Sequence, residues 1–234
     1  MNAFEFTPIG VVESCYKEKF AIPRQPGLVP SGRAIIRILP PYNSAEAFDG
    51  LQQSSHLWIQ FVFHKALMDK WRPQVRPPRL GGNKKLGVFA TRSTHRPNPI
   101  GLSVVKLDSI DFAEGVALQL SGIDVLDGTP VLDIKPYIPY ADRVASATHG
   151  FANDRPSLIP ISFTERANRQ IVDPDLRVFI TEVLQQDPRP AYQAIDTERV
   201  YGVNLLDFNL TWRYIKDKQQ ISIQVLELAV LAHP

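Results

Sequence analysis

The first 140 residues carry a two-residue alternation of apolar and polar positions, which predicts a series of short β-strands. Residues 57–63 differ, because they form an apolar run rich in aromatic side chains, and such a run fits a strand buried on both faces. The remaining predicted strands lie at Phe4, Phe6, Ile9 and Val11, at Ala34, Ile36 and Ile38, and over residues 87–91, 102–107, 116–120 and 131–134. Turn signals such as Asp127-Gly128 separate them, so this part of the chain favours a β-barrel or a β-sandwich.

Helical signals are few and lie mostly in the last third of the chain. Short helices are predicted over residues 43–51 and 163–172. A third helix begins at Pro174, because proline is favoured at the first position of a helix. Its apolar residues recur at helical spacing, at Leu176, Phe179, Ile180, Val183 and Leu184. Residues 187–192, DPRPAY, end this helix because proline cannot continue it.

Alternating apolar residues return near the end of the chain and flank Asp217-Lys218, which predicts a β-hairpin. They are Leu210, Trp212 and Tyr214 before the turn and Ile221, Ile223 and Val225 after it. Residues 147–160 are polar, contain glycine and proline, and lack periodicity, so they indicate a domain boundary. We therefore expect a mainly β protein, with an N-terminal β-domain over residues 1–145 and a small α+β domain over residues 146–234.

Composition places the chain among ordinary globular proteins. Its 234 residues are 44% hydrophobic and 21% charged, and its 20 prolines disfavour long helices. Cys15 is the single cysteine, so an internal disulfide is impossible and a reducing compartment is expected. No apolar run approaches the ~18 residues of a membrane span, and the first residues lack the pattern of a secretory signal. We therefore expect a soluble, cytoplasmic protein that does not enter a membrane.

Positive charge is concentrated in one segment, although the net charge of the whole chain is only +2. Residues 70–96 contain no acidic residue but eight basic ones: Lys70, Arg72, Arg76, Arg79, Lys84, Lys85, Arg92 and Arg96. The other 18 basic residues face 24 acidic ones, so the rest of the chain carries a net charge of −6. Such a segment attracts polyanions with a salt-dependent affinity. The alternative is a solvated loop whose arginines pair with acids elsewhere.

Several catalytic motifs are absent from the sequence. No GxxxxGK[ST] phosphate loop is present, and the glycines of RLGGNKKLG do not follow a predicted strand and open a helix, as a Rossmann fingerprint requires. The histidines show no HExxH or other short metal-binding spacing, so no metal site is expected. Ser103 lacks a GxSxG elbow, and Cys15 has no acid–base partner nearby in the sequence.

Two segments gather residues that suit a ligand. In GVFATRSTHRPNPIGLS, two prolines fix the loop around Asn98, with Arg92 and Arg96 beside it. A tight turn with ordinary capping is the alternative, but a turn does not account for two arginines and an asparagine in one loop. The second segment, GIDVLDGTPVLDIKPYIPYAD, has three acids within ten residues, which could bind hydroxyl groups or an amine, or cap turns. These acids are Asp124, Asp127 and Asp133, and Lys135 follows them.

Six segments of the chain together resemble the TsaA-like family of bacterial tRNA methyltransferases, over about residues 4–192. They are KEKFAIPRQPGL, SHLWIQFVFH, RPPRLGG, GVFATRSTHRPNPIGLS, DVLDGTPVLDIKPY and DPRPAY, in this order. The resemblance implies a small N-terminal β-barrel that binds S-adenosylmethionine and a C-terminal domain that assists tRNA binding. It also implies a homodimer that methylates the N6 nitrogen of N6-threonylcarbamoyladenosine (t6A) beside the anticodon. The missing Rossmann fingerprint is consistent with such a barrel.

The resemblance also implies the residues of the cofactor site. The matching positions are Pro23, Arg24, Gln25, Phe63, His64, Arg92, Leu102, Asp124, Val125, Leu126 and Asp127. Arg24 or Arg92 suits the methionine carboxylate of the cofactor, and an aspartate suits its ribose hydroxyls. Phe63 and Leu102 suit an apolar slot for adenine, although core packing is the alternative for both.

Catalysis should depend mainly on alignment and desolvation, because an exocyclic adenine amine is a poor nucleophile. Asp127 or Asp133, the latter close to Lys135 in the sequence, is expected to accept the proton. The basic segment and DPRPAY are expected to hold tRNA phosphates and to stack a base. The expected RNA-binding residues are Arg76, Arg79, Lys84, Lys85, Arg96, Asn98, Lys135, Arg189 and Tyr192.

Two other functions remain open from the sequence. The first is a non-catalytic RNA-binding barrel, which would bind tRNA without affinity for S-adenosylmethionine. The second is a methyltransferase for another RNA or a small molecule, which would not depend on the threonylcarbamoyl group. The sequence does not indicate which tRNAs are chosen or whether the site is shared across a dimer.

Overall fold

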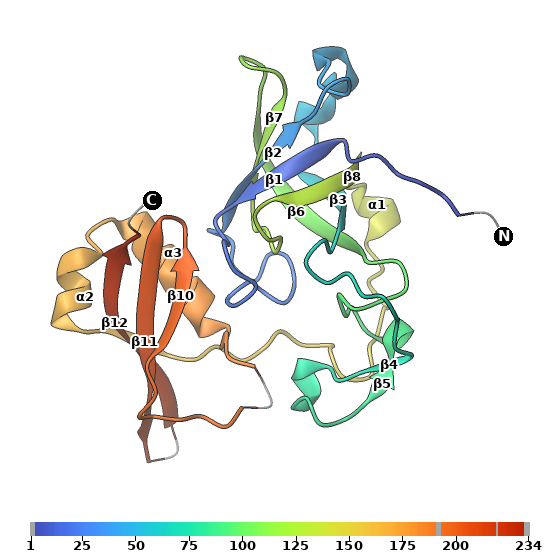
Figure 1. The fold of residues 1–234 in the computed structure, drawn as a ribbon. Coiled ribbons are helices and arrows are strands. Elements are labelled where there is room, and N and C mark those ends of the chain that lie inside the picture. Colours follow the sequence, from blue (N-terminus) through green and yellow to red (C-terminus); the bar gives the residue numbers. More distant parts are fainter. Residues whose placement is uncertain (1–2, 191–192, 219, 232–234) are drawn as a thin grey trace.

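The computed structural model describes residues 3–190, 193–218 and 220–231, which form a barrel and a second, open sheet (Figure 1). The barrel is closed, with antiparallel neighbours in the order β1-β2-β7-β6-β3-β8. Its strands are β1 (Gly10–Ser14), β2 (Arg33–Ile38), β3 (His56–Val62), β6 (Ile100–Asp111), β7 (Ala117–Ser121) and β8 (Thr129–Pro136). The expected N-terminal β-barrel is therefore confirmed.

The second sheet has the strand order β10-β11-β12-β9 and packs against two helices. Its elements are β9 (Ile161–Phe163), α2 (Glu165–Gln170), α3 (Pro174–Gln185), β10 (Tyr201–Leu205), β11 (Phe208–Asp217) and β12 (Gln220–Val230). The hairpin predicted at Asp217-Lys218 is confirmed, because Asp217 of β11 pairs with Gln220 of β12. The helix predicted to begin at Pro174 is also confirmed, with Asp173 as its N-cap. This part of the chain is thus a small α+β unit, as expected.

Short elements and loops fill the rest of the described chain. They are the 3-10 helices Ala45–Phe48, Leu51–Gln53, Pro78–Leu80 and Val88–Ala90, the two-stranded sheet of β4 (Gln74–Val75) and β5 (Leu86–Gly87), and α1 (Pro139–Asp142). The connection between barrel and second sheet, residues 143–160, has no helix or strand. The domain boundary predicted at residue 145 falls in this connection.

The strand predicted over residues 57–63 has one buried face, not two. Along β3, Leu57, Ile59 and Phe61 are buried, whereas Trp58 and Gln60 between them are only half-buried. The reason is the barrel, since alternate side chains of a closed sheet point inward and outward. Trp58, an aromatic residue that made the run look continuous, lies on the outer face and packs near Tyr137.

Four other local predictions were wrong. No strand begins at Phe4 and Phe6, which are 84% and 68% exposed. Residues 87–91 are mostly a 3-10 turn, in which the Thr91 N–H donates to the Val88 carbonyl. Two 3-10 helices replace the helix predicted over residues 43–51. The helix predicted over residues 163–172 is shorter than expected, with α2 at Glu165–Gln170. Its predicted first residue, Phe163, instead pairs in β9, and the Thr164 side chain caps α2.

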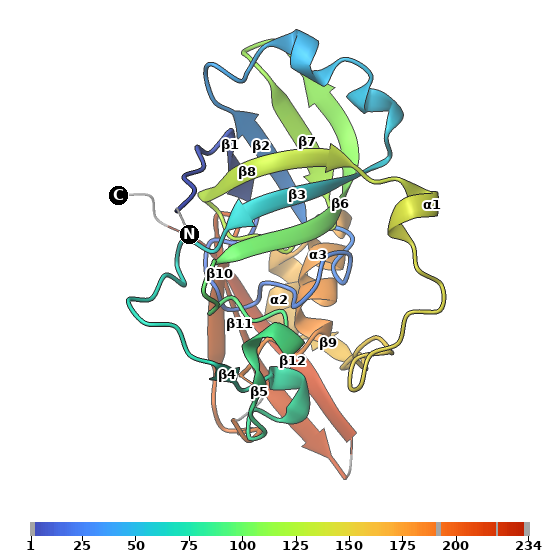
Figure 2. The ribbon, with the colours of Figure 1, turned by 90° about the vertical axis from the view of Figure 1, so that its right-hand side faces the viewer.

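The two units share one continuous core, and Figure 2 shows α3 between the barrel and the strands of the second sheet. Tyr16, just after β1, forms a bridge with Leu205 of β10, and its ring packs 6.0 Å from that of Phe179 in α3. The Glu182 carboxylate of α3 accepts a hydrogen bond from the Ser31 N–H at 2.9 Å. These contacts seat α3 against the loop that joins β1 and β2, and they fix where the two sets of loops meet.

Candidate active site at one end of the barrel

One end of the barrel opens into a cleft of about 800 Å³. Val62 at the end of β3, Ile100 at the start of β6 and Thr129 at the start of β8 all line it, so these strands deliver their loops to one place. The loop between β1 and β2 closes one side. It is fastened to the segment after β7 by a 2.8 Å hydrogen bond from the Gly27 N–H to the Gly122 carbonyl, and Gly122 has the left-handed φ of 71° that favours glycine.

A half-buried carboxylate is the main chemical feature of the cleft. Asp124 lines the cleft and accepts a 2.6 Å hydrogen bond from the hydroxyl of Ser103, which is only 2% exposed. Burial raises the pKa of Asp124 to about 6, while the Ser103 hydrogen bond and the charge of Arg92 act in the opposite direction. A carboxyl group with a pKa near 6 can exchange a proton close to neutral pH.

Arg92 lies in the same cleft on a loop that is tied down by its own side chains. Its guanidinium donates to the Gln25 side-chain oxygen at 2.5 Å, which links the loop to the β1–β2 connection. Arg96 donates to the carbonyl oxygens of Thr91 and Ser93, each at 3.2 Å. Arg96 therefore holds the loop in shape, and Arg92 is the cation of this loop whose charge acts on Asp124.

His64 lines the cleft as a neutral ring. Burial lowers its pKa, and the nearby charges of Lys65 and Lys19 lower it further. Its Nδ1 lies 3.4 Å from the hydroxyl of Thr129 at the start of β8. At neutral pH the ring adds no positive charge to a cleft that already holds Arg92.

The apolar wall of the cleft depends on one glycine. Gly101 of β6 faces Phe61 of β3, and a Cβ at residue 101 would lie only 2.3 Å from the Phe61 ring. The absence of a side chain there lets Phe61 pack inward, with the Phe63 ring edge-on at 5.2 Å. Leu102 points the other way and is 51% exposed, so core packing does not account for it. The cleft thus has an apolar wall opposite its charged residues.

Comparisons with known proteins agree with this geometry. The family description "tRNA-methyltransferase O N-terminal domain" matches residues 11–143, and "TrmO C-terminal domain" matches residues 156–229. The chain belongs to the TrmO family. It is 51% identical over 221 residues to the tRNA (adenine(37)-N6)-methyltransferase of Escherichia coli K12, covering 91% of this chain and 94% of the relative.

Two proteins of Pseudomonas aeruginosa are also similar to the chain. A putative S-adenosylmethionine-dependent methyltransferase, RcsF, is 52% identical over 229 residues, covering 95% of this chain and 96% of the relative. A crystal structure of TrmO from this organism superposes with a TM-score of 0.80 and 44% identity, covering 98% of each chain. The protein is therefore an enzyme of the methyltransferase class.

Ten of the eleven residues that the sequence predicted for the cofactor site of a TrmO-type barrel line this cleft. They are Pro23, Arg24, Gln25, Phe63, His64, Arg92, Leu102, Asp124, Val125 and Leu126. Asp127 is the exception. Its carboxylate accepts a 2.7 Å hydrogen bond from the Ser14 N–H and forms an ion pair with Lys17 at 3.1 Å, so it closes the turn before β8.

Asp133, the other acid expected to accept the proton, also does not line the cleft. It lies in β8 and pairs with Lys135 at 2.5 Å, so these two residues are close together, as expected, and neither lines the cleft. Of the three acids in this segment, only Asp124 enters the TrmO cleft.

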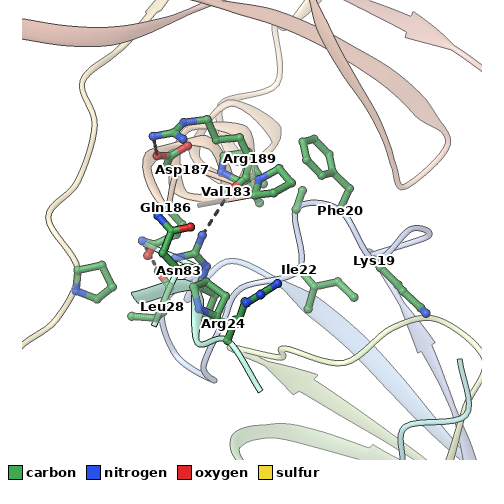
Figure 3. Close-up of a pocket in the computed structure, with 17 residues that line it drawn as sticks. Lys19, Phe20, Ile22, Arg24, Leu28, Asn83, Val183, Gln186, Asp187 and Arg189 are labelled. Atoms are coloured by element: carbon green, nitrogen blue, oxygen red, sulfur yellow. Dashed lines mark hydrogen bonds and ion pairs between the residues drawn. The ribbon is translucent and has the colours of Figure 1, made fainter. Parts of the chain in front are cut away.

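The expected RNA-binding residues fall into several places in the TrmO fold. Arg96 and Asn98 line the barrel cleft, whereas Arg76 and Arg189 line a second cleft between the two units (Figure 3). Arg79 donates to the backbone carbonyl of Asp154, and Lys84 and Lys85 are exposed. Tyr192 lies outside the described residues.

The basic segment keeps its charge. Within the part of the chain that the structure describes, none of its eight Lys and Arg residues forms an ion pair with a carboxylate. The alternative of arginines neutralised by distant acids therefore has no support among these residues. Over the same described ranges, no group of three or more His, Cys, Asp or Glu residues comes together, and no helix is long and apolar enough to cross a membrane.

Sequence reasoning missed Ser103, although a signal was present. Gly101, Ser103, Val105 and Leu107 occupy the inward positions of β6, and serine is the one polar side chain among them. A buried hydroxyl needs a hydrogen-bond partner, and Asp124 is that partner. The absence of a GxSxG elbow excludes Ser103 as a nucleophile but says nothing about a role as hydrogen-bond donor to Asp124.

Proposed function

We propose that this protein transfers a methyl group from S-adenosylmethionine to the N6 nitrogen of t6A at position 37 of tRNA. The observation that carries the proposal is the barrel cleft in which the half-buried Asp124 lies beside Arg92 and an apolar wall. The name of the E. coli relative, tRNA (adenine(37)-N6)-methyltransferase, supports the same site on the base. The threonylcarbamoyl group follows from the resemblance of the sequence segments.

The cleft residues fit the parts of the proposed cofactor. Arg92 suits its carboxylate, because a guanidinium can donate two parallel hydrogen bonds to a carboxylate. Phe63 and Leu102 offer apolar surface for its adenine ring. The neutral His64 and the Asp124 carboxylate suit a cation, since neither places a positive charge against the sulfonium. When bound, S-adenosylmethionine supplies an electrophilic methyl group.

The chain itself contributes alignment, exclusion of water and a proton acceptor. The exocyclic amine of adenine is weakly nucleophilic, so holding it in line contributes most, on the order of 7–11 kcal/mol in well-oriented reactions. We assign proton acceptance to Asp124 in place of Asp127 or Asp133, because it alone of the three lines the cleft. Ser103 fixes the carboxylate by its 2.6 Å hydrogen bond and leaves the second oxygen for the amine proton.

The pH dependence of kcat/KM, which reports the free enzyme, is expected to show a single acidic limb with a midpoint near pH 6. Asp124 accepts a proton only when it is ionised, and burial raises its pKa to about 6. Below that pH the carboxyl group is protonated, so kcat/KM should fall about tenfold between pH 7 and pH 5. Methyl transfer at subsaturating substrate across this range measures the effect. Ser103→Ala removes a hydrogen bond that favours the ionised form, so the midpoint should move toward neutral pH; an unmoved limb would exclude Asp124 as its source.

The exposed lysines of the basic segment are expected to bind tRNA through phosphates. Replacing Lys84 and Lys85 together by alanine should weaken tRNA binding and reduce the slope of log Kd against log salt concentration by about 1–2. Binding of S-adenosylmethionine should not change, because neither lysine lines the barrel cleft. Filter binding at several salt concentrations tests this, and an unchanged slope would identify the segment as a solvated loop.

We also propose a cytoplasmic homodimer. Phe89 lines the cleft and is 74% exposed, and Leu67 and Trp71 are 64% and 52% exposed; large exposed apolar side chains suit a protein interface. A tRNA substrate and a single, buried cysteine support a cytoplasmic location. Sedimentation of the purified protein tests the dimer.

The decisive assay incubates the protein with S-adenosylmethionine and either t6A-containing or unmodified tRNA, followed by mass spectrometry of the nucleosides. N6-methylated t6A from the modified tRNA alone is the expected product. Equal methylation of both tRNAs would indicate a methyltransferase for a different group. Binding of tRNA without cofactor affinity or product would indicate the non-catalytic barrel.

A further inference from the structure

A second cleft, of about 1040 Å³, lies where the two units meet (Figure 3). Three segments that are far apart in the sequence form its walls: the β1–β2 loop, the tip of the basic segment, and the end of α3 with the prolines that follow it. Their lining residues include Phe20 and Leu28, Arg76 and Asn83, and Gln186 and Arg189, respectively. Gln186 also joins two of these walls, because its amide donates to the Leu28 carbonyl at 3.3 Å.

The charge of this second cleft is positive. Lys19, Arg24 and Arg76 line it, and none of them forms an ion pair among the described residues. Asp187 is the only acid among its described lining residues, and its carboxylate binds the Arg189 guanidinium at 3.1 Å. The charge of Arg189 is therefore neutralised by Asp187, and its side chain is only 15% exposed. The other three cations suit an anionic ligand.

An aromatic ring lies beside these cations. Phe20 is half-buried and lines the cleft, and behind it the fully buried Trp212 stacks at 5.8 Å with an angle of 15° between the rings. Ile22, Leu28 and Val183 add apolar surface. A rigid aromatic ring next to several cations is the arrangement with which proteins hold unpaired nucleotides, by stacking the base and pairing the phosphate.

The second cleft lies next to the barrel cleft. Lys19, Ile22 and Arg24 line both of them, so the β1–β2 loop is their common wall. On this wall Gln25 accepts from Arg92 in the barrel cleft, whereas Arg24 donates to the Arg189 carbonyl at 3.4 Å, on the side of the second cleft (Figure 3). Arg24 is therefore placed to contact a ligand that occupies both clefts.

We propose that the second cleft binds the nucleotide adjacent to the target adenosine in the same RNA strand, with its base against Phe20. The phosphate between the two nucleotides then lies near Arg24, on the common wall of the two clefts. This inference rests on the proposed function, because it takes the barrel cleft as the place of the target base. The common wall favours one RNA strand over a free mononucleotide, because neighbouring nucleotides of one strand can occupy adjacent clefts.

The test combines protein variants with RNA lacking one base. Kd for tRNA is measured by fluorescence anisotropy with intact t6A-containing tRNA and with versions that are abasic at either neighbour of position 37. Phe20→Leu removes the ring but keeps an apolar side chain, and Asn83→Trp fills the cleft from an exposed loop position. Ala113→Trp, at the exposed turn between β6 and β7, is the matched control because it lines neither cleft.

With wild-type protein, loss of one neighbouring base should weaken binding about tenfold. In the Phe20→Leu and Asn83→Trp proteins the same abasic tRNA should bind within about twofold of intact tRNA, because the base has already lost its site. Arg76→Ala, at a residue that lines the second cleft and not the barrel cleft, should weaken tRNA binding and leave the Kd for S-adenosylmethionine unchanged. Full sensitivity of both cleft variants to the abasic change, or unchanged tRNA binding in Arg76→Ala, would overturn the proposal. These binding measurements do not require methyl transfer, so they separate this inference from the proposed reaction.

Discussion

Replacement of Asp124 by asparagine is expected to lower kcat for methyl transfer by about 10²–10⁴-fold, the usual contribution of a general base. The amide has nearly the shape of the carboxylate and can still accept the Ser103 hydrogen bond, but it cannot take the amine proton. The protein should therefore fold normally and bind tRNA as before. Single-turnover kinetics with saturating cofactor separates this loss from any change in cofactor affinity.

The same substitution at Asp133 distinguishes the two assignments of the proton acceptor. Asp133 pairs with Lys135 on β8 and does not line the cleft, so Asp133→Asn should change kcat less than about twofold. A large loss in Asp133→Asn with normal activity in Asp124→Asn would restore the assignment made from the sequence. Equal, small effects of both would show that the transfer needs no base from this segment.

The sequence predicted those parts of the fold that depend on local periodicity. The strand pattern and the helix from Pro174 appear as expected, since side-chain alternation and a first-position proline are local signals. The start of the helix predicted over residues 163–172 was wrong, because pairing of Phe163 with Val225 of β12 outweighs the helical pattern. A partner 62 residues away has no trace in a local window.

In the candidate site, too, the residue types could be predicted from the sequence, but their positions depend on distant contacts. Asp124, Asp127 and Asp133 look equivalent in the sequence, and only the path of the chain separates them. The left-handed Gly122 and Gly128 turn the loop so that Asp124 enters the cleft, whereas Asp127 is held outside by the Ser14 N–H. The meeting of the β1–β2 loop with the end of α3 has no periodic signal, so the second cleft could not be predicted.

Replacement of Arg92 by alanine is expected to raise the Kd for S-adenosylmethionine by about 10–100-fold, the loss of a paired, charge-assisted hydrogen bond to its carboxylate. Arg92→Lys keeps the charge but loses the two-pronged geometry, so its Kd should lie between those of the wild type and Arg92→Ala. Arg76→Ala removes the same charge from the second cleft and should affect tRNA binding alone. Calorimetric titration of these three variants and of Arg24→Ala with the cofactor measures these differences. If Arg92→Ala binds the cofactor as the wild type does while Arg24→Ala does not, the carboxylate contacts Arg24, on the common wall of the two clefts, and not Arg92.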